Sequence, residues 1–374
     1  MNPRHDLIPG FATPEGTARF RDPFAGRLPG HFREFRGLSL ASIGVGTYLG
    51  DPDAATDALY REALTRAIEL GSNVIDTAVN YRHQRSERAT GQALATLIRQ
   101  GKLHRDQIFV ATKGGFLSFD GEEPADAAAY FRERYISPGL VNPLDVAAGC
   151  HVMSPAYLMD QIEVSRHNLG LETLDLYYLH NPETQLQRGT AEDFYARLRA
   201  SFEALESAVA AGKIRAYGTA TWNAYRVNPS APEAVSLPRV VRLAEEVGGP
   251  AHHFRALQLP FNLAMLEALD PATQSMDGKP TPALVAARSR GLMVFASASL
   301  LQGRLAQGLP SEITRHFAGL DTDAQRALQF VRSTPGITAA LVGMSRREHV
   351  EENLATARVA PMSFTEYQAM FSGG

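Results

Sequence analysis

The sequence lacks the features of disulfide-stabilised, membrane-bound and nucleic-acid-binding proteins. Its 374 residues include one cysteine, Cys150, which excludes an internal disulfide framework and is typical of a reducing compartment. The formal net charge is -3 without a long basic run, so neither nucleic acid nor an anionic membrane surface is an expected partner. No stretch approaches the ~20 apolar residues of a membrane span, and residues 1–10 lack the apolar segment of a signal peptide. We therefore expect a cytoplasmic location.

Short apolar runs alternate with segments of helical periodicity through most of the chain. Hydrophobic residues make up 44% of the sequence, enough for a large core. The alternation predicts parallel strands joined by helices, because such strands are buried on both faces. Eight runs in one chain favour a closed (β/α)8 barrel, the TIM barrel of the α/β class, over an open sheet. The eight runs are 42–48, 73–78, 108–114, 174–180, 214–221, 256–263, 292–299 and 338–344.

Two segments lie outside this alternation. Residues 1–36, rich in glycine, proline, arginine and phenylalanine, are expected to be an N-terminal extension of a barrel formed by 37–374. At their junction, 31–35 and 38–41 are expected to pair as a hairpin. After the third strand, 116–154 exceed the length of a short βα loop and are predicted to be an insertion carrying five aromatic residues. This insertion forms either a lid or aromatic wall over a pocket, or a contact with the extension or with another subunit of an oligomer.

Polar side chains follow three consecutive predicted strands. Asp76 ends the second strand, Lys113 the third and His180 the fourth, and Tyr81 follows Asp76 by five residues. In a (β/α)8 barrel, the active site is built at the C-terminal ends of the strands. An acid, a cation and an imidazole at these positions therefore predict an active site.

The motifs around these residues resemble those of the aldo-keto reductase family from about residue 38 to 357. The resemblance implies an NAD(P)H-dependent oxidoreductase that interconverts a small-molecule carbonyl compound (an aldehyde, ketone or keto-sugar) and the corresponding alcohol. Several motifs in the right order are more specific than any one of them. They are GVGTY at 44–48, NVIDTAVNY at 73–81, TK at 112–113, SRHNLGL at 165–171, LDLYYLHNP at 174–182, GKIRAYGT at 212–219, QLPFN at 258–262 and VGMSRREHVEEN at 342–353.

The chemistry of carbonyl reduction gives each of the four residues a role. A tyrosine hydroxyl can donate a proton to the developing alkoxide, but its ordinary pKa of about 10 makes it a weak acid. We expect Lys113 to lower the pKa of Tyr81, the general acid/base, because a nearby ammonium favours phenolate. A buried lysine needs a carboxylate partner to stay charged, and Asp76 supplies it. His180 is expected to donate a hydrogen bond to the substrate oxygen.

The same resemblance implies a cofactor site along the later strand ends. Gln258 matches the residue that binds the nicotinamide carboxamide, and Thr221 lies near the other such position. Glu352 and Asn353 match residues that contact adenine. The start of the following helix is expected to receive phosphate. The complete predicted cofactor set is Thr221, Gln258, Ser297, Leu300, Gly303, Gly343, Ser345, Arg346, Glu352 and Asn353.

The sequence departs from the family pattern at this site. Ser297 stands where an aromatic residue usually stacks on the nicotinamide. Gly343 and His349 stand where many members place a lysine and an arginine near the 2′-phosphate of NADP. Because Arg346 or Arg347 can take over that role, NADP is the predicted cofactor and NAD the alternative.

Three aromatic residues are predicted to contact the substrate: Tyr48, Phe116 and Trp222. Trp222 either stacks on the nicotinamide or packs at the barrel rim. No metal is expected, because the other histidines lack ligand spacing. Three of them, His104, His151 and His167, are expected to be solvated or to cap helices.

The glycines of GVGTYLG at 44–50 do not fit a dinucleotide-binding G-x-G-x-x-G fingerprint, because the third glycine falls one place late. A non-catalytic regulatory subunit that binds nicotinamide nucleotide remains the alternative function. The missing aromatic residue at Ser297 favours it, whereas the retention of all four catalytic residues argues against it.

Overall fold

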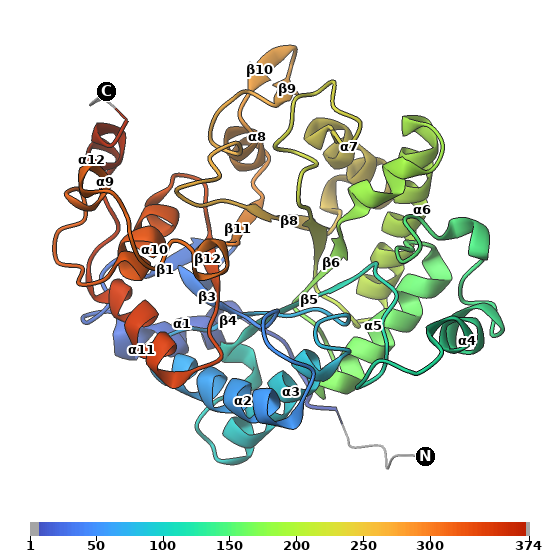
Figure 1. Cartoon of the computed structure of the whole chain (residues 1–374), viewed down its shortest axis with the longest axis horizontal. Helices are drawn as coiled ribbons and strands as arrows, with labels where there is room; N and C mark the ends of the chain where they lie inside the picture. Colours follow the sequence, from blue (N-terminus) through green and yellow to red (C-terminus); the bar gives the residue numbers. More distant parts are fainter. Residues whose placement is uncertain (1–6, 372–374) are drawn as a thin grey trace.

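The computed structural model describes residues 7–371, so residues 1–6 of the predicted extension and residues 372–374 lie outside the described residues. Eight parallel strands close into a barrel that helices surround (Figure 1). β12 pairs with β3 and closes the ring, which confirms the predicted (β/α)8 fold. The strands are β3 (Ile43–Gly46), β4 (Val74–Asp76), β5 (Phe109–Gly114), β6 (Leu176–His180), β7 (Tyr217–Ala220), β8 (Phe254–Pro260), β11 (Met293–Ser297) and β12 (Ala339–Gly343).

Seven strands lie inside their predicted runs, and β8 begins two residues before its run. The helices between them begin and end where capping residues allow. α5 has Pro155 in its first turn and ends at Gly170, which adopts φ 65°. Ser154 is the N-cap residue of α5, but its hydroxyl makes no capping hydrogen bond. The main helices are α2 (Ala54–Glu69), α3 (Arg85–Arg99), α5 (Pro155–Leu169), α6 (Ala191–Ala210), α7 (Leu237–Gly248), α8 (Ala283–Ser289), α10 (Asp323–Ser333) and α11 (Arg347–Ala355).

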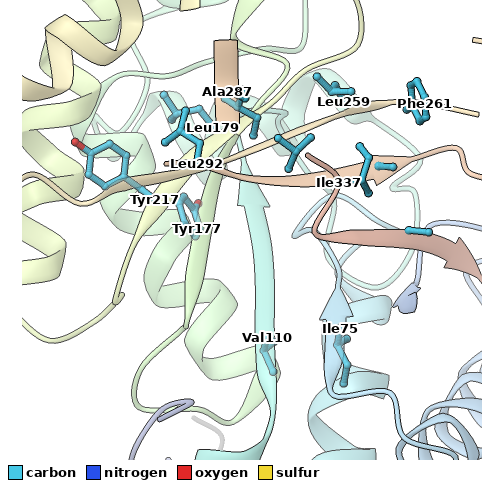
Figure 2. Close-up of a cluster of buried hydrophobic side chains, with 14 of the residues drawn as sticks. Ile75, Val110, Tyr177, Leu179, Tyr217, Leu259, Phe261, Ala287, Leu292 and Ile337 are labelled. Atoms are coloured by element: carbon cyan, nitrogen blue, oxygen red, sulfur yellow. The ribbon is translucent and has the colours of Figure 1, made fainter. Parts of the chain in front are cut away.

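Side chains alternate between two hydrophobic clusters along each strand. On β4, Val74 belongs to the cluster inside the barrel and Ile75 to the larger cluster between barrel and helices. Figure 2 shows part of the outer cluster, including Ile75, Val110 and Tyr177. This alternation buries both faces of every strand and fixes which side chains reach the barrel end.

The N-terminal residues close the bottom of the barrel. β1 (Phe32–Phe35) and β2 (Leu38–Ala41) form the predicted antiparallel hairpin. Leu40 belongs to the inner cluster, so the hairpin plugs the N-terminal end of the barrel. α1 (Pro14–Arg21) packs on β2 and on the short helix η2 (Arg105–Gln107).

The residues after β5 fold around a small core of their own. Tyr135, Val141 and Val152 pack there against Tyr157 of α5. Within residues 7–371, no helix is long and apolar enough to cross a bilayer. The remaining elements are η1 (Asp22–Phe24), α4 (Ala127–Phe131), the π-helical turn η3 (Arg132–Ile136), η4 (Pro143–Asp145), η5 (Pro182–Gln187), η6 (Gly249–Ala251), β9 (Gln274–Met276), β10 (Lys279–Thr281), η7 (Leu301–Gly303), α9 (Ser311–Thr314), η8 (Thr356–Arg358) and α12 (Phe364–Ala369).

Candidate active site

A buried lysine joins the side chains that follow β4. Lys113, on β5 and fully buried, donates to Asp76 Oδ2 at 2.6 Å, to the main-chain oxygen of Thr77 at 2.8 Å and to Tyr81 Oη at 3.1 Å. The three hydrogens of its ammonium group therefore have three partners. The ammonium also lies 4.7 Å from the centre of the Tyr81 ring. The structure thus brings Lys113 to Asp76 and Tyr81, which precede it in the sequence by 37 and 32 residues.

The buried surroundings and the neighbouring charges shift the pKa values of Lys113 and Tyr81. Burial disfavours the Lys113 ammonium, but the nearby Asp76 and Tyr81 outweigh burial and raise the pKa of Lys113, so it stays charged. Burial raises the pKa of Tyr81, and Lys113 lowers it only in part. The expected lowering by Lys113 is therefore present, but the expectation of a net depressed pKa for Tyr81 is wrong. The physical reason is the cost of burying a phenolate.

His180, at the end of β6, faces this group as a neutral imidazole. Its ring centre lies 5.8 Å from that of Tyr81 and 5.0 Å from that of Phe116. Burial, helped by the positive charge of Lys113, lowers the pKa of His180 well below its ordinary value. Its Nδ1 is buried and has no hydrogen-bond partner among the described residues. A neutral imidazole can still donate one hydrogen bond to a substrate oxygen.

His151 supports His180 from the segment after β5. His151 is buried, and its Nε2 donates to the main-chain oxygen of His180 at 2.8 Å. Gln185 Nε2 lies 3.1 Å from the other ring nitrogen and fixes this tautomer. The expectation that His151 is solvated or caps a helix is wrong, because its partners come from positions 29 and 34 residues away and leave no local pattern. His104 and His167 are exposed, as expected.

Asp76 also contacts a residue of the predicted cofactor site. Gln258 Nε2, on β8, donates to Asp76 Oδ1 at 2.7 Å. Each carboxylate oxygen of Asp76 therefore has its own partner, Gln258 on one side and Lys113 on the other. The amide of Gln258 is thereby fixed in orientation.

A cavity of about 700 Å³ opens above these residues at the C-terminal end of the barrel. Every predicted site residue lines it except Lys113, which is buried beneath Asp76 and Tyr81, and Arg346. Arg346 precedes α11 and is exposed outside the cavity, so the structure does not bring it to the site. Other lining residues were not predicted, among them Thr47, Leu49, Tyr60, Asn80, Asn181, Ser299 and Gln302. Most of them follow strand ends, which is the only signal the sequence gives for them.

The lining fits a nicotinamide dinucleotide. The cavity extends from Tyr81 and Gln258 to Glu352 and Asn353 on α11. Asn353 Oδ1 is buried there and has no hydrogen-bond partner among the described residues, so it can accept a hydrogen bond from a bound base. No lysine or arginine lines the cavity.

Three aromatic residues lie on the side of the cavity expected to receive substrate. The Tyr48 ring lies 5.0 Å from that of Tyr81, and Phe116 packs against His180. Trp222 lines the cavity and is 48% exposed, so about half of its surface is free of packing at the rim. Ser297 also lines the cavity, so no aromatic ring stands at the position expected to stack on a nicotinamide.

Comparison with known proteins identifies the class of this barrel. The model of the aldo/keto reductase family matches residues 42–233, about half of the chain. The chain belongs to the aldo/keto reductase family.

Individual relatives are distant. The chain is 24% identical to the uncharacterized oxidoreductase YqkF of Bacillus subtilis (strain 168), over 83% of this chain and 85% of that protein. It is 27% identical to the NADH-specific methylglyoxal reductase of Escherichia coli (strain K12), over half of each protein. The structure of an aldo/keto reductase from Klebsiella pneumoniae in complex with NADP and acetate matches with a TM-score of 0.59 and 24% identity, over 92% of this chain and 94% of that chain. At this identity the structural match shows the shared fold.

Proposed function

We propose that the chain interconverts an aldehyde or ketone and its alcohol with NADPH or NADH. The observation that carries this proposal is the hydrogen bond of 3.1 Å between the Lys113 ammonium and the Tyr81 hydroxyl, at the base of the cavity. A nicotinamide dinucleotide, when bound, supplies or accepts the hydride. Gln258 and Asn353 would hold its two ends.

The side chains of this site manage the proton. In reduction, the Tyr81 hydroxyl donates its proton to the carbonyl oxygen, and the Lys113 ammonium stabilises the phenolate that is left. Asp76 keeps Lys113 charged by accepting its shortest hydrogen bond, 2.6 Å. His180 donates a hydrogen bond to the same carbonyl oxygen and orients it. The raised pKa of Tyr81 keeps the proton in place until the substrate oxygen takes it.

The cavity favours neutral substrates with an apolar group. Tyr48, Phe116 and Trp222 supply aromatic surface, and no lysine or arginine of the lining can pair with a phosphate or carboxylate. An anionic substrate would lose its hydration without gaining a cationic partner. Aromatic and aliphatic aldehydes and ketones therefore fit this site better than phosphorylated sugars or keto acids.

In this proposal the choice of cofactor depends on Arg346, whose exposed side chain lies outside the cavity and would have to turn toward it. Among the described residues no acidic side chain pairs with Arg346, whereas Arg347 lies 3.1 Å from Glu351. Arg346 is thus the arginine that can turn to a 2′-phosphate at the start of α11. We propose NADP as the cofactor on this ground, with NAD as the alternative because the cavity itself offers Glu352 and no cation.

Residues 37–374 act as one domain in this proposal, and the insertion 116–154 supports the substrate side as a wall. Phe116 is its one residue that lines the cavity, and His151 holds the main chain of His180. The rest of the segment packs around Tyr135. This packing argues against a loose lid.

The decisive experiment measures turnover. Purified protein is mixed with NADPH or NADH and a panel of aldehydes, ketones and keto-sugars, and the loss of reduced-nicotinamide absorbance is followed. We expect turnover by the wild type and a decrease in kcat of about 10²-fold or more in Tyr81→Phe, because general acid catalysis is lost. The dissociation constant of the cofactor should stay within twofold.

Two outcomes would contradict the proposal. Cofactor binding without turnover of any compound would favour the regulatory subunit, for which Ser297 in place of a stacking aromatic is the supporting feature. Full activity in Tyr81→Phe would refute the proton-transfer role of Tyr81.

A further inference from the structure

The turn directly after Tyr81 is strained and is tied to a second loop by one buried arginine. Resting on the proposed role of Tyr81, we propose that Arg82 is a positioning residue that fixes the Tyr81 turn against the loop 48–53. Through this link it sets where Tyr81 and Tyr48 lie in the cavity.

The backbone of the turn takes an unusual conformation. Arg82, His83 and Gln84 have φ of 49°, 56° and 70°, so three consecutive residues with side chains are left-handed. Such residues persist only where their surroundings hold them. The far end of the turn is held by Gln84, whose Nε2 donates to the main-chain oxygen of Phe119 at 2.9 Å. At the near end, next to Tyr81, the Arg82 side chain adds its contacts to the backbone hydrogen bond from Tyr81 N to Ala78 O at 3.1 Å.

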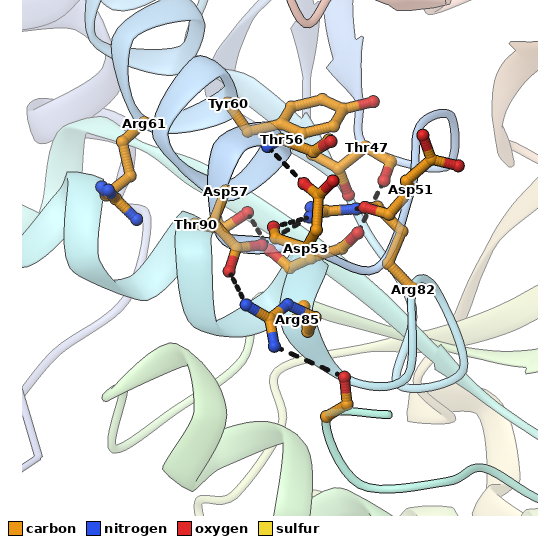
Figure 3. Close-up of polar contacts among 12 residues, drawn as sticks. Thr47, Asp51, Asp53, Thr56, Asp57, Tyr60, Arg61, Arg82, Arg85 and Thr90 are labelled. Atoms are coloured by element: carbon orange, nitrogen blue, oxygen red, sulfur yellow. Dashed lines mark hydrogen bonds and ion pairs between the residues drawn. The ribbon is translucent and has the colours of Figure 1, made fainter. Parts of the chain in front are cut away.

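The Arg82 side chain is 2% exposed and makes three anchoring contacts (Figure 3). Its Nε donates to the main-chain oxygen of Asp51 at 2.8 Å, and Nη2 donates to that of Asp53 at 3.1 Å. Nη2 also pairs with Asp57 Oδ1 on α2 at 2.5 Å. The guanidinium lies 5.4 Å from the centre of the Tyr60 ring. One side chain thus fixes the backbone of the loop and the start of α2.

The anchored loop carries residues of the cavity. Tyr48 and Leu49 line it, and the Tyr48 ring lies 5.0 Å from that of Tyr81. The hydroxyl of Tyr60 donates to the main-chain oxygen of Leu49 at 2.8 Å. Because Arg82 follows Tyr81 in the chain, its contacts connect the proton donor to the aromatic wall opposite it.

Arg85 offers a matched control for Arg82, because Asp57 pairs with both arginines (Figure 3). Arg85 Nη2 lies 2.7 Å from Asp57 Oδ2, but Arg85 is 25% exposed and makes no contact with the backbone of 48–53. Removal of either arginine leaves Asp57 with one cationic partner. The two variants therefore differ in loop anchoring and share the loss of one ion pair.

The experiment compares Arg82→Ala, Arg82→Lys and Arg85→Ala in the full chain. We expect Arg82→Ala to lower kcat at least tenfold, with the dissociation constant of NADPH within twofold. Arg82→Lys should fall between Arg82→Ala and the wild type, because an ammonium keeps the Asp57 pair but not all three contacts. Arg85→Ala should keep kcat within twofold. A merely stabilising role would lower the melting temperature without moving kcat at temperatures where the protein is folded.

A crystal structure of Arg82→Ala, or of Arg82→Lys if the first variant does not fold, supplies a readout independent of turnover. We expect Tyr81 Oη beyond hydrogen-bond distance of Lys113 Nζ. An unmoved Tyr81 together with unchanged kcat, or an equal loss of kcat in Arg85→Ala, would overturn the positioning role. An inactive wild type would instead refute the proposed function, and the position of Tyr81 would still decide the role of Arg82.

Discussion

Glu183 is a buried carboxyl group that titrates near neutral pH. It lies beside Trp222, on the side of the cavity proposed to receive substrate. The residue is 7% exposed, and its Oε1 accepts the main-chain N–H of Trp222 at 2.6 Å and of Asn223 at 3.3 Å. Its Oε2 is buried without a hydrogen-bond partner among the described residues. Burial raises the pKa of Glu183 to about 7, although these N–H groups and the charge of Arg226 lower it in part.

Protonation of Glu183 should loosen Trp222. The main chain of Trp222 is held from two sides, by Glu183 at its N–H and by Arg226 Nε at its oxygen, 3.0 Å away. A hydrogen bond to a charged group is stronger than one to a neutral group by about 1 kcal/mol. We therefore expect the KM of an aromatic aldehyde to rise about fivefold as the pH falls from 8 to 6.

Stability should change in the opposite direction. A pKa raised from 4.5 to about 7 means that the folded chain binds this proton more tightly than the unfolded chain does. The resulting stabilisation is fully present below pH 4.5 and is lost as the pH rises through 7. Its size is of the order of 3 kcal/mol, since each pKa unit corresponds to about 1.4 kcal/mol. Glutamine does not titrate, so the Glu183→Gln variant should not lose this stability as the pH rises through 7.

The assay compares wild type, Glu183→Gln and the control Glu233→Gln at pH 5 to 8. Glu233 lies in the same loop, and its Oε1 accepts a hydrogen bond from Asn223 Nδ2 at 3.3 Å. This hydrogen bond does not involve Trp222. Melting temperature and KM are measured at each pH. Glu183→Gln should gain melting temperature relative to wild type as the pH rises, with a KM that no longer depends on pH. The reasoning is refuted if Glu183→Gln and wild type show parallel pH dependence in both quantities.

Two further variants test the cofactor end and the support of His180. Arg346→Ala should raise the dissociation constant of NADPH about tenfold and leave that of NADH within twofold, since an exposed arginine–phosphate contact contributes about 1–2 kcal/mol. Fluorescence titration measures both constants, and an equal effect on the two cofactors would exclude a contact with the 2′-phosphate. His151→Ala should lower kcat about tenfold with cofactor binding unchanged, because the main chain of His180 loses its donor. His167→Ala is the control, since this exposed histidine bonds Glu163 within its own helix, and the same loss in both variants would argue against a specific role for His151.

The barrel could be predicted because its signals are local. Each buried strand is a short apolar run, and the turn at Arg36 and Gly37 marks the hairpin, with φ of 47° and 85°. Asp76, Lys113 and His180 stand at strand ends, and in a closed barrel such ends necessarily converge. The grouping of these three side chains with Tyr81 therefore follows from the periodicity of the chain.

The features that escaped prediction depend on distances that no local pattern encodes. Asp76 and Gln258 are bonded across 182 residues, and His151 reaches His180 from within an irregular segment. The raised pKa of Tyr81 results from a balance between burial and Lys113, and only the folded structure gives the burial. Sequence spacing placed Arg346 near the phosphate site, but not the direction of its side chain.

The contact between Asp76 and Gln258 changes how the site works as a unit. A carboxylate with one lysine partner would serve the proton donor alone, and its second oxygen would need a solvent partner. Here the second oxygen accepts the Gln258 amide at 2.7 Å, and that amide lines the cavity where a nicotinamide carboxamide would bind. Because one carboxylate accepts from both Lys113 and Gln258, a shift of Asp76 would move the ammonium that bonds Tyr81 and the Gln258 amide together. In the proposed reaction, β4, the strand that ends at Asp76, would therefore help to set the position of Tyr81 relative to a bound nicotinamide.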